Sequence, residues 1–139
     1  MDYFTQSARE TKELGRKIGA SLDPGETLAL FGDLGGGKTT FLQGVAQGLG
    51  IKGRILSPTF IISREYSLKE GGKFYHFDWY RFDNERQAQF LGIEELFGNK
   101  NIVAIEWADR AGSLLPKKRI EIYFKYQGEN KRQITIIKK

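Results

Sequence analysis

The segment from Gly32 to Thr39 has the residue types and the spacing of a P-loop, a loop that binds the phosphates of a nucleotide. It reads Gly-Asp-Leu-Gly-Gly-Gly-Lys-Thr and fits the pattern G-x-x-x-x-G-K-[ST]. Glycines let backbone N–H groups turn inward around the phosphates, and the Lys38 ammonium can reach the β- and γ-phosphates. The Thr39 hydroxyl can bind Mg²⁺, and the start of the following helix attracts anions. The segment therefore predicts a site for a nucleoside triphosphate such as ATP, together with Mg²⁺.

The residues on either side of this loop strengthen that interpretation. Thr27–Phe31 is a short apolar run typical of a buried strand, and Thr40–Leu49 has apolar residues at the spacing of a helix face. Gly50 is placed to end that helix. The alternative, an ordinary glycine-rich turn, would not require a strand directly before it and a helix directly after it.

Length and composition limit the classes of protein to consider. The chain has 139 residues, which is enough for one domain, and we expect that domain to span residues 1–139. The absence of cysteine excludes disulfides, thiolate metal sites and a cysteine nucleophile. The first residues do not resemble a signal peptide and no apolar run reaches membrane-spanning length, so we expect a soluble, cytoplasmic protein.

Positive charge is concentrated near the C-terminus. Between Lys117 and Lys139, eight lysines and arginines stand against two glutamates, so this segment carries more than the entire net charge of +5. One interpretation is a face that meets an anionic partner such as RNA. The other is a solvated edge hairpin whose lysines discourage aggregation. Because Lys131 and Arg132 are far in sequence from the P-loop, we expect their replacement to leave ATP binding intact.

Local patterns predict the remaining elements. A capping box at Ser7-Ala8-Arg9-Glu10 opens a helix whose predicted buried face consists of Ala8, Thr11, Leu14, Ile18 and Leu22. Alternation or unbroken apolar runs predict strands, and a further segment predicts one or two short helices; the strands are Phe60–Tyr66, Lys73–Trp79, Ile102–Ile105, Arg119–Tyr126 and Gln133–Ile137, and the helical segment is Asp83–Phe97. This order predicts an α/β domain of the three-layer P-loop NTPase type, with a sheet that mixes parallel and antiparallel pairs.

Glu106 is the candidate acid for a metal. It directly follows the apolar strand Ile102–Ile105, and α/β sheets bind ligands at the carboxyl ends of such strands. We therefore expect Glu106 to lie opposite Thr39 and to bind Mg²⁺, and the alternative is a solvated carboxylate in a loop. Trp107 comes next, and composition alone favours a place in the core for its side chain.

A second polar cluster reads His76-Phe77-Asp78-Trp79-Tyr80-Arg81. Strand alternation predicts His76, Asp78 and Tyr80 on one face of the sheet, with Phe77 and Trp79 on the other. Asp78 is suited to orient the attacking water or to hold Mg²⁺ through a water. His76 is the only histidine and is either part of this site or a structural group. Arg81 could pair with a phosphate or with Asp78, and the hydroxyls of Ser57-Pro58-Thr59 could sense the γ-phosphate.

Taken together, these segments resemble the TsaE family (formerly YjeE), the bacterial ATPases of tRNA threonylcarbamoyladenosine biosynthesis. The resemblance covers about Ser7 to Arg119, and the combination of motifs is far more specific than the P-loop alone. The P-loop continues into Thr40, and four more motifs follow in the family's order, namely Ser57-Pro58-Thr59-Phe60, His76-Phe77-Asp78-Trp79-Tyr80-Arg81, Leu91-Gly92-Ile93-Glu94 and Ile105-Glu106-Trp107. Beyond Arg119 the similarity is faint, so nothing about the basic segment transfers.

The resemblance implies a weak ATPase that works with TsaD-type transferase and TsaB-type partner subunits, away from any membrane. Together these proteins place threonylcarbamoyl on the adenosine next to the anticodon, and tRNA contact would come through the complex. The implied catalytic residues are Asp78, Glu106 and Lys38, and the implied metal ligands are Thr39 and Glu106. The implied nucleotide-binding residues are Thr11, Gly35, Gly36, Gly37, Lys38, Thr39, Thr40 and Trp107.

Two other functions share the P-loop. A small-molecule or nucleotide kinase would also use a P-loop and Mg²⁺, but it normally needs an acceptor-binding insertion and an arginine-bearing lid, and little chain remains for them between Lys38 and Glu106. A non-hydrolysing regulatory module would bind nucleotide and dock on a partner. Asp78 and Glu106 favour hydrolysis over that module.

Overall fold

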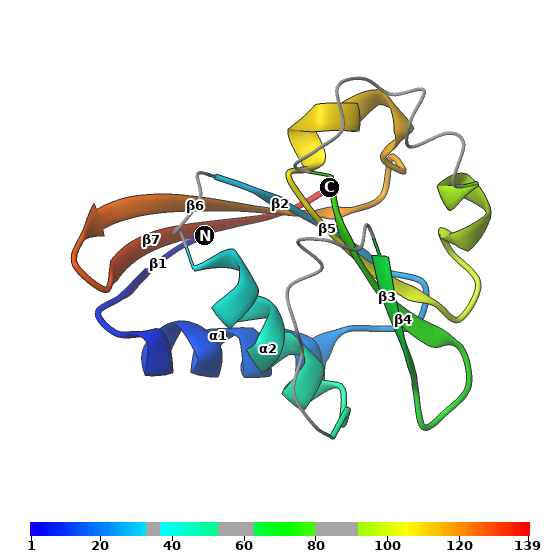
Figure 1. Ribbon diagram of the computed structural model, residues 1–139, viewed down its shortest axis with the longest axis horizontal. Helices are drawn as coiled ribbons and strands as arrows, with labels where there is room; N and C mark the ends of the chain where they lie inside the picture. The colour runs from blue at the N-terminus through cyan, green and yellow to red at the C-terminus, as the bar shows by residue number, and fades with distance from the viewer. Residues whose placement is uncertain (33–36, 53–62, 80–91) are drawn as a thin grey trace.

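The computed structural model describes residues 1–32, 37–52, 63–79 and 92–139. Within these ranges, seven strands form one sheet in the order β1-β7-β6-β2-β5-β4-β3 (Figure 1). The elements in chain order are β1 Asp2–Thr5, α1 Ala8–Ser21, β2 Thr27–Phe31, α2 Lys38–Gly48, β3 Ser63–Ser67, β4 Lys73–Asp78, the 3₁₀ segment η1 Ile93–Leu96, β5 Ile102–Glu106, the 3₁₀ segment η2 Ala108–Leu114, β6 Ile120–Gly128 and β7 Lys131–Lys138.

The sheet mixes parallel and antiparallel pairs, as the sequence predicted. Strand β2 pairs in parallel with both β5 and β6, and β4 pairs in parallel with β5. Antiparallel pairs flank this centre, with β3 on β4, β7 on β6 and β1 on β7. Because the four parallel strands end at the same edge of the sheet, residues that follow or close β2, β4 and β5 meet there.

Hydrophobic side chains fill both faces of the central strands. Helices α1 and α2 cover one face, where Leu28, Leu30 and Phe74 of the sheet meet Phe41 and Val45 of α2 (Figure 1). On the other face, η1 and η2 lie over β2, β5 and β4, and their apolar side chains pack against Phe77, Trp79 and Ile105. The described chain therefore has the layered α/β architecture that was predicted.

Helices α1 and α2 touch backbone to backbone. A Cβ added to Gly15 of α1 would lie 2.1 Å from the Phe41 carbonyl oxygen, and one added to Gly44 of α2 would lie 1.9 Å from the Lys12 carbonyl oxygen. Any side chain at Gly15 or Gly44 would force the helices apart. The buried residues of α1 are accordingly Thr11, Gly15 and Gly19. Of the predicted face, Thr11 is confirmed, Leu14, Ile18 and Leu22 are only partly buried, and Ala8 is exposed.

Helix ends follow the predicted signals. The Ser7 hydroxyl accepts a hydrogen bond from the Glu10 backbone N–H at 3.1 Å and caps α1, while the Glu10 carboxylate accepts from the Gln6 N–H rather than closing a full capping box. Gly50 follows α2 in the left-handed conformation, with φ of 83°. No helix in the described ranges is long and apolar enough to cross a membrane.

The interpretation of the C-terminal hairpin as an edge hairpin is wrong. Strand β1, which the sequence analysis missed, pairs with β7 on its outer side, so Asp2 lies opposite Thr135 and Phe4 lies opposite Gln133. The described edge strands are β1 and β3. Within the predicted helical segment, Ile93–Leu96 is a 3₁₀ helix, and residues 80–91 lie outside the described ranges.

Candidate nucleotide-binding site

The described end of the P-loop sits between β2 and α2. Gly37 adopts the left-handed conformation with φ of 93° and is the N-cap of α2, which begins at Lys38. The Gly37 carbonyl oxygen accepts the hydrogen bond of the Phe41 N–H at 2.9 Å. Glycine is suited to this position because it adopts positive φ without steric cost. The predicted loop residues Gly35 and Gly36 lie outside the described ranges.

The Lys38 side chain is buried and held by contacts with Gly32 and Trp107. Its side chain is 4% exposed, and its Nζ donates a hydrogen bond to the Gly32 carbonyl oxygen. The ammonium also lies 3.9 Å from the centre of the Trp107 ring, within the range of a cation–π contact. Trp107 turns the chain after β5 with φ of 58°. Its ring therefore lies beside the loop lysine and is also partly buried against the hydrophobic cluster of the far face, so both places considered for it have support.

Thr39, Glu106 and His76 form one connected group. The Thr39 hydroxyl donates to Glu106 Oε1 at 3.4 Å, and His76 Nε2 lies 2.6 Å from Glu106 Oε2. Glu106 is 4% exposed and His76 is 0% exposed. Thus the structure brings the predicted metal pair Thr39 and Glu106 together from α2 and β5, and it adds a histidine from β4.

Asp78 closes β4 beside this group. It lies opposite Glu106 in the parallel register of β4 and β5, and the next backbone N–H, of Trp79, donates to the Glu106 carbonyl oxygen at 3.1 Å. Phe77 and Trp79 pack into the hydrophobic cluster on the far face, which confirms the predicted alternation for the described residues. Tyr80, Arg81 and the segment Ser57–Thr59 lie outside the described ranges.

A small cavity of about 40 Å³ lies beside Gly37. It joins the predicted residues Thr11 and Thr40 to two residues that the sequence analysis missed, Asn130 and Arg132. A Cβ on Gly37 would lie 3.6 Å from Thr11 Cγ2 and 3.7 Å from Arg132 Nε. The start of β7 therefore lies close to the described end of the P-loop, so Arg132, although far from it in sequence, is near it in space.

Arg132 and Thr11 are held by neighbours in the sheet. The Arg132 guanidinium lies 5.0 Å from the centre of the Tyr126 ring and donates to the Gly128 carbonyl oxygen at 3.2 Å. The Thr11 hydroxyl is 2.7 Å from the Thr5 hydroxyl of β1. The excess of basic residues after Lys117 was the sequence signal for Arg132, but only the sheet order links that signal to the loop.

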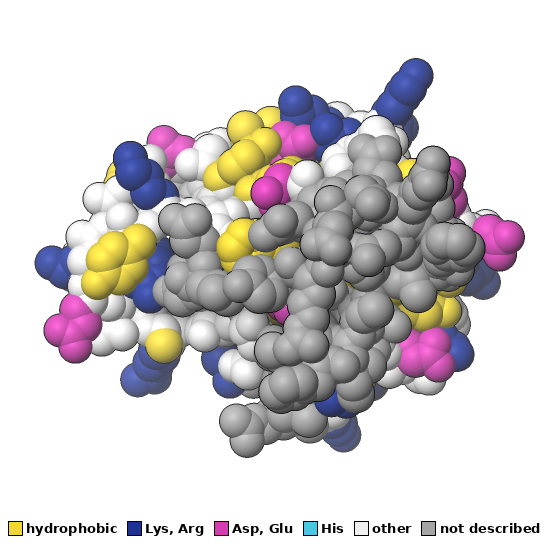
Figure 2. Space-filling model, turned by 45° about the horizontal axis from the view of Figure 1, so that its top comes forward, with side chains coloured by type: hydrophobic (Ala, Val, Ile, Leu, Met, Phe, Trp, Pro, Cys, Tyr) yellow, Lys and Arg dark blue, Asp and Glu magenta, His cyan; other side chains and the backbone are white. Residues whose placement is uncertain are grey.

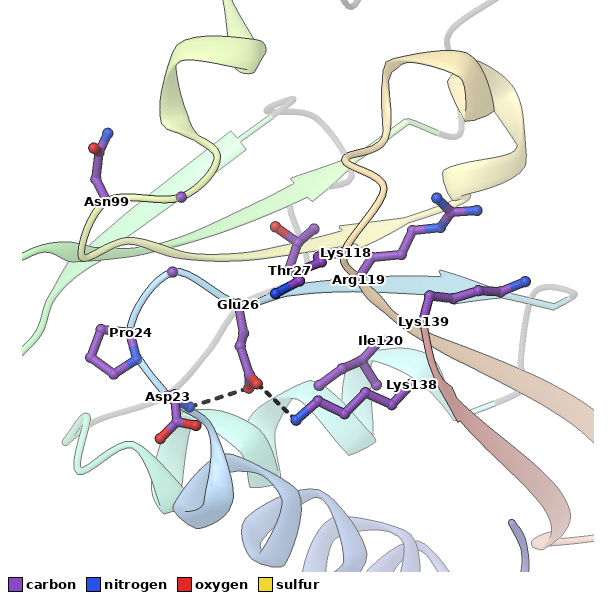
Figure 3. Close-up of a pocket in the computed structure, with 12 residues that line it drawn as sticks. Asp23, Pro24, Glu26, Thr27, Asn99, Lys118, Arg119, Ile120, Lys138 and Lys139 are labelled. Atoms are coloured by element: carbon purple, nitrogen blue, oxygen red, sulfur yellow. Dashed lines mark hydrogen bonds and ion pairs between the residues drawn. The ribbon is translucent and has the colours of Figure 1, made fainter.

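A larger pocket, of about 500 Å³, opens at the opposite edge of the sheet (Figure 3). It is lined by residues at the start of β2 and β6 and at the end of β7, including Glu26, Lys118, Arg119, Lys138 and Lys139. Glu26 accepts a hydrogen bond from the Asp23 N–H and an ion pair from Lys138, both at 3.2 Å (Figure 3). On the described surface in Figure 2, Lys and Arg side chains lie beside Asp and Glu rather than in one continuous patch.

Comparisons with known proteins agree with one another. The family model of the threonylcarbamoyl adenosine biosynthesis protein TsaE matches residues 5–134. The tRNA threonylcarbamoyladenosine biosynthesis protein TsaE of Bacillus subtilis is 41% identical over 136 residues, which cover 97% of this chain and 84% of that protein. The protein of the same name from Treponema pallidum is 33% identical and matches 98% of this chain and 99% of its own length.

A solved structure also matches. The crystal structure of Bacillus subtilis YdiB superimposes with a TM-score of 0.81 at 36% sequence identity, and the match covers 98% of this chain and 83% of that chain. The family model and the two relatives span nearly the whole chain, from β1 to β7, and so include both the P-loop and Arg132 at the start of β7.

Proposed function

Because the chain belongs to the TsaE family, we propose that it binds Mg²⁺–ATP, hydrolyses it slowly, and thereby supports the formation of threonylcarbamoyladenosine in tRNA. The contact of Thr39 with Glu106 beside Lys38 is the observation that carries the proposal. It joins the end of β5 to the start of α2, where a P-loop protein has its phosphates and metal.

The proposed phosphate ligand is Lys38. Its ammonium would leave the Gly32 carbonyl oxygen for the β- and γ-phosphates of ATP, since a charge-assisted contact to phosphate is stronger than one to a neutral carbonyl. The Trp107 ring would keep the lysine near the loop during this exchange. The N-terminal end of α2, starting at Lys38, adds backbone N–H groups and a favourable dipole for the anion.

Thr39 and Glu106 fit a Mg²⁺ ion. Hydroxyl and carboxylate oxygens are hard donors of the kind that this ion prefers, and the Thr39 and Glu106 oxygens lie 3.4 Å apart. In the described part of the chain, no group of three or more His, Asp or Glu side chains is placed to hold a metal alone. We propose that Thr39 and Glu106 share the ion with the nucleotide. When bound, the ion would neutralise charge on the β- and γ-phosphates.

Asp78 is the proposed hydrolytic residue, acting by orienting the attacking water. Its place opposite Glu106, at the end of β4, supports this role. We propose that Thr11, Thr40 and Arg132, which line the small cavity beside Gly37, contact the nucleotide next to α1. Arg132 brings a cation to this side, and a guanidinium is suited to bind a phosphate oxygen.

The proposed partners are TsaD-type transferase and TsaB-type subunits, with tRNA contacted through that complex in the cytoplasm. Membership of the family supports this assignment. One alternative is a small-molecule or nucleotide kinase, for which little chain remains between Lys38 and Glu106. The other is a non-hydrolysing module, and the position of Asp78 beside Glu106 favours hydrolysis over it.

ATP turnover should therefore be measured for the protein alone, then with its partners, and then with tRNA, without any other phosphoryl acceptor. We expect slow hydrolysis alone and faster hydrolysis in the complex. In the complex, Asp78→Ala should keep nucleotide affinity while turnover falls at least about tenfold, which corresponds to about 1.4 kcal/mol of barrier. ATP binding without turnover under all three conditions would favour the regulatory module, and turnover that requires an added acceptor would favour a kinase.

A further inference from the structure

The carboxylate of Glu106 is held from two sides. One oxygen accepts from Thr39, and the other lies 2.6 Å from His76 Nε2. With Thr39 donating to Oε1, the carboxylate accepts at both oxygens, and His76 Nε2 is the donor. The side chain is almost fully buried, and a buried carboxylate is stable only when its oxygens are hydrogen-bonded. His76 therefore supplies the shorter of the two contacts that keep Glu106 in place.

The polar atoms of His76 make no other described contact. Its side chain is completely buried, and within the described ranges Nδ1 has no hydrogen-bond partner. A histidine that served only to fill the core would be equivalent to an apolar residue of similar size. Instead the ring carries the cost of one buried nitrogen without a partner while its other nitrogen binds Glu106. This arrangement points to the contact with Glu106 as the reason for a histidine here.

We propose that His76 is a positioning residue, which holds Glu106 Oε2 so that Oε1 faces Thr39 and the metal. The inference rests on the proposed function, because it gives His76 a role in Mg²⁺–nucleotide binding through Glu106. Groups that hydrogen-bond a metal ligand typically change metal affinity by about 10- to 100-fold when they are removed. His76 itself touches neither the nucleotide nor the metal in this scheme.

Three variants separate this role from core filling. His76→Leu keeps much of the volume but removes the donor, whereas His76→Gln places an amide N–H near the position of Nε2. Phe74→Leu is the matched control, because Phe74 lies two residues earlier on the same strand, is also completely buried, and packs in the apolar cluster beneath α2. Thermal unfolding measures the packing loss of each variant.

Nucleotide affinity is then measured by calorimetry with a non-hydrolysable ATP analogue, in Mg²⁺ and in EDTA. The gain from Mg²⁺ is the ratio of nucleotide affinity in Mg²⁺ to nucleotide affinity in EDTA. We expect His76→Leu to reduce this ratio about tenfold, with little change in the affinity measured in EDTA. His76→Gln should retain most of that gain. Phe74→Leu should lower the melting temperature without changing the affinity gained from Mg²⁺. Equal losses in both media, or failure of His76→Gln to restore the gain, would overturn the proposal.

The wild-type protein allows a second measurement that needs no folded variant. His76 is the only histidine in the chain, so a ¹⁵N spectrum of imidazole nitrogens reports on it alone. We expect the proton on Nε2, and a shift of that signal when Mg²⁺ is added to the nucleotide complex. A proton on Nδ1, or no response to Mg²⁺, would refute the positioning role. If wild type bound nucleotide equally in Mg²⁺ and EDTA, the proposed metal site itself would fall, and this inference with it.

Discussion

The two ends of the central parallel strands, which are the carboxyl end beside the P-loop and the amino end beside the larger pocket, hold their charged side chains in different ways. At the end of the sheet where the parallel strands finish, Lys38, Glu106 and His76 are buried. His76 contacts the Glu106 carboxylate, and Lys38 lies over the ring of Trp107, the residue after Glu106. At the opposite end of the strands, a pocket of about 500 Å³ is lined by four cations, Lys118, Arg119, Lys138 and Lys139 (Figure 3). There Lys138 pairs with Glu26 at 3.2 Å, and the Lys138 side chain is largely exposed.

This difference suggests a criterion other than the number of cations for the proposed site, namely the burial of its charged groups. The larger pocket contains ion pairs on the surface of the sheet, which solvent screens and which contribute little energy. The proposed site keeps a lysine, a glutamate and a histidine away from water, where each misplaced polar group is costly. A fold that holds polar groups under those conditions constrains their geometry, and catalytic or binding sites require such constraint.

The largest expected effect is the loss of Lys38. Lys38→Ala removes the proposed contact to the β- and γ-phosphates, and we expect nucleotide affinity in Mg²⁺ to fall about a hundredfold, or about 2.7 kcal/mol. Lys138→Ala at the opposite edge is the matched control, because Lys138 pairs with Glu26 far from the P-loop. Calorimetry on both variants makes the test, and equal affinities for the two would refute the assignment of the site to the P-loop edge.

A smaller effect is expected at the turn between β6 and β7. Arg132→Ala should weaken nucleotide binding by about tenfold, because its guanidinium lines the cavity beside Gly37 and would make a charge-assisted contact to a phosphate there. Lys131→Ala removes the same charge from the preceding, exposed residue and should leave affinity unchanged. Titrations of both variants with ATP distinguish a local contact from a general effect of charge. A loss shared equally by both would leave Arg132 without a specific role.

The parts of the site that sequence predicts are those encoded within a few consecutive residues. The strand, the loop and the helix around Lys38 follow one another along the chain, and Glu106 directly ends an apolar strand. The contact of His76 with Glu106 depends on the parallel register of β4 and β5, which joins residues thirty positions apart. Local periodicity contains no information about that register.

The missed features share this dependence on the sheet order. Arg132 reaches Gly37 because β6 pairs in parallel with β2, so that the turn after β6 lies at the same edge as the P-loop. Strand β1 has only four residues, too few for a clear alternation, and it is defined by its pairing with β7. The helix face of α1 was predicted from apolar spacing, but the close approach of α2 at Gly15 decides which residues are buried.

The smallest expected effect concerns stability at the second edge, where Glu121 is buried on β6. Its carboxylate accepts hydrogen bonds from Arg119 at 2.7 Å and from the Tyr123 hydroxyl at 2.8 Å, and it lies 3.7 Å from the Lys139 ammonium. Burial acts to raise the pKa of Glu121, but the hydrogen bonds and the positive charges outweigh it and leave the pKa below its ordinary value of 4.5.

A lowered pKa in the folded state makes the ionised Glu121 stabilising above about pH 4.5, and that contribution is lost as the pH falls through the folded pKa. Glu121→Gln should therefore lower the free energy of unfolding by about 1 kcal/mol at pH 7. The difference from wild type should shrink as the pH falls below about 4.5, because protonation removes the same charge from wild type. Urea unfolding between pH 7 and pH 3 measures both curves. The Glu121 carboxylate faces Arg119 and Lys139 rather than the P-loop, so ATP affinity at pH 7 should be unchanged. A loss of affinity would show that the two ends of the sheet are coupled, and the stack of Tyr123 on Phe31 would be the route.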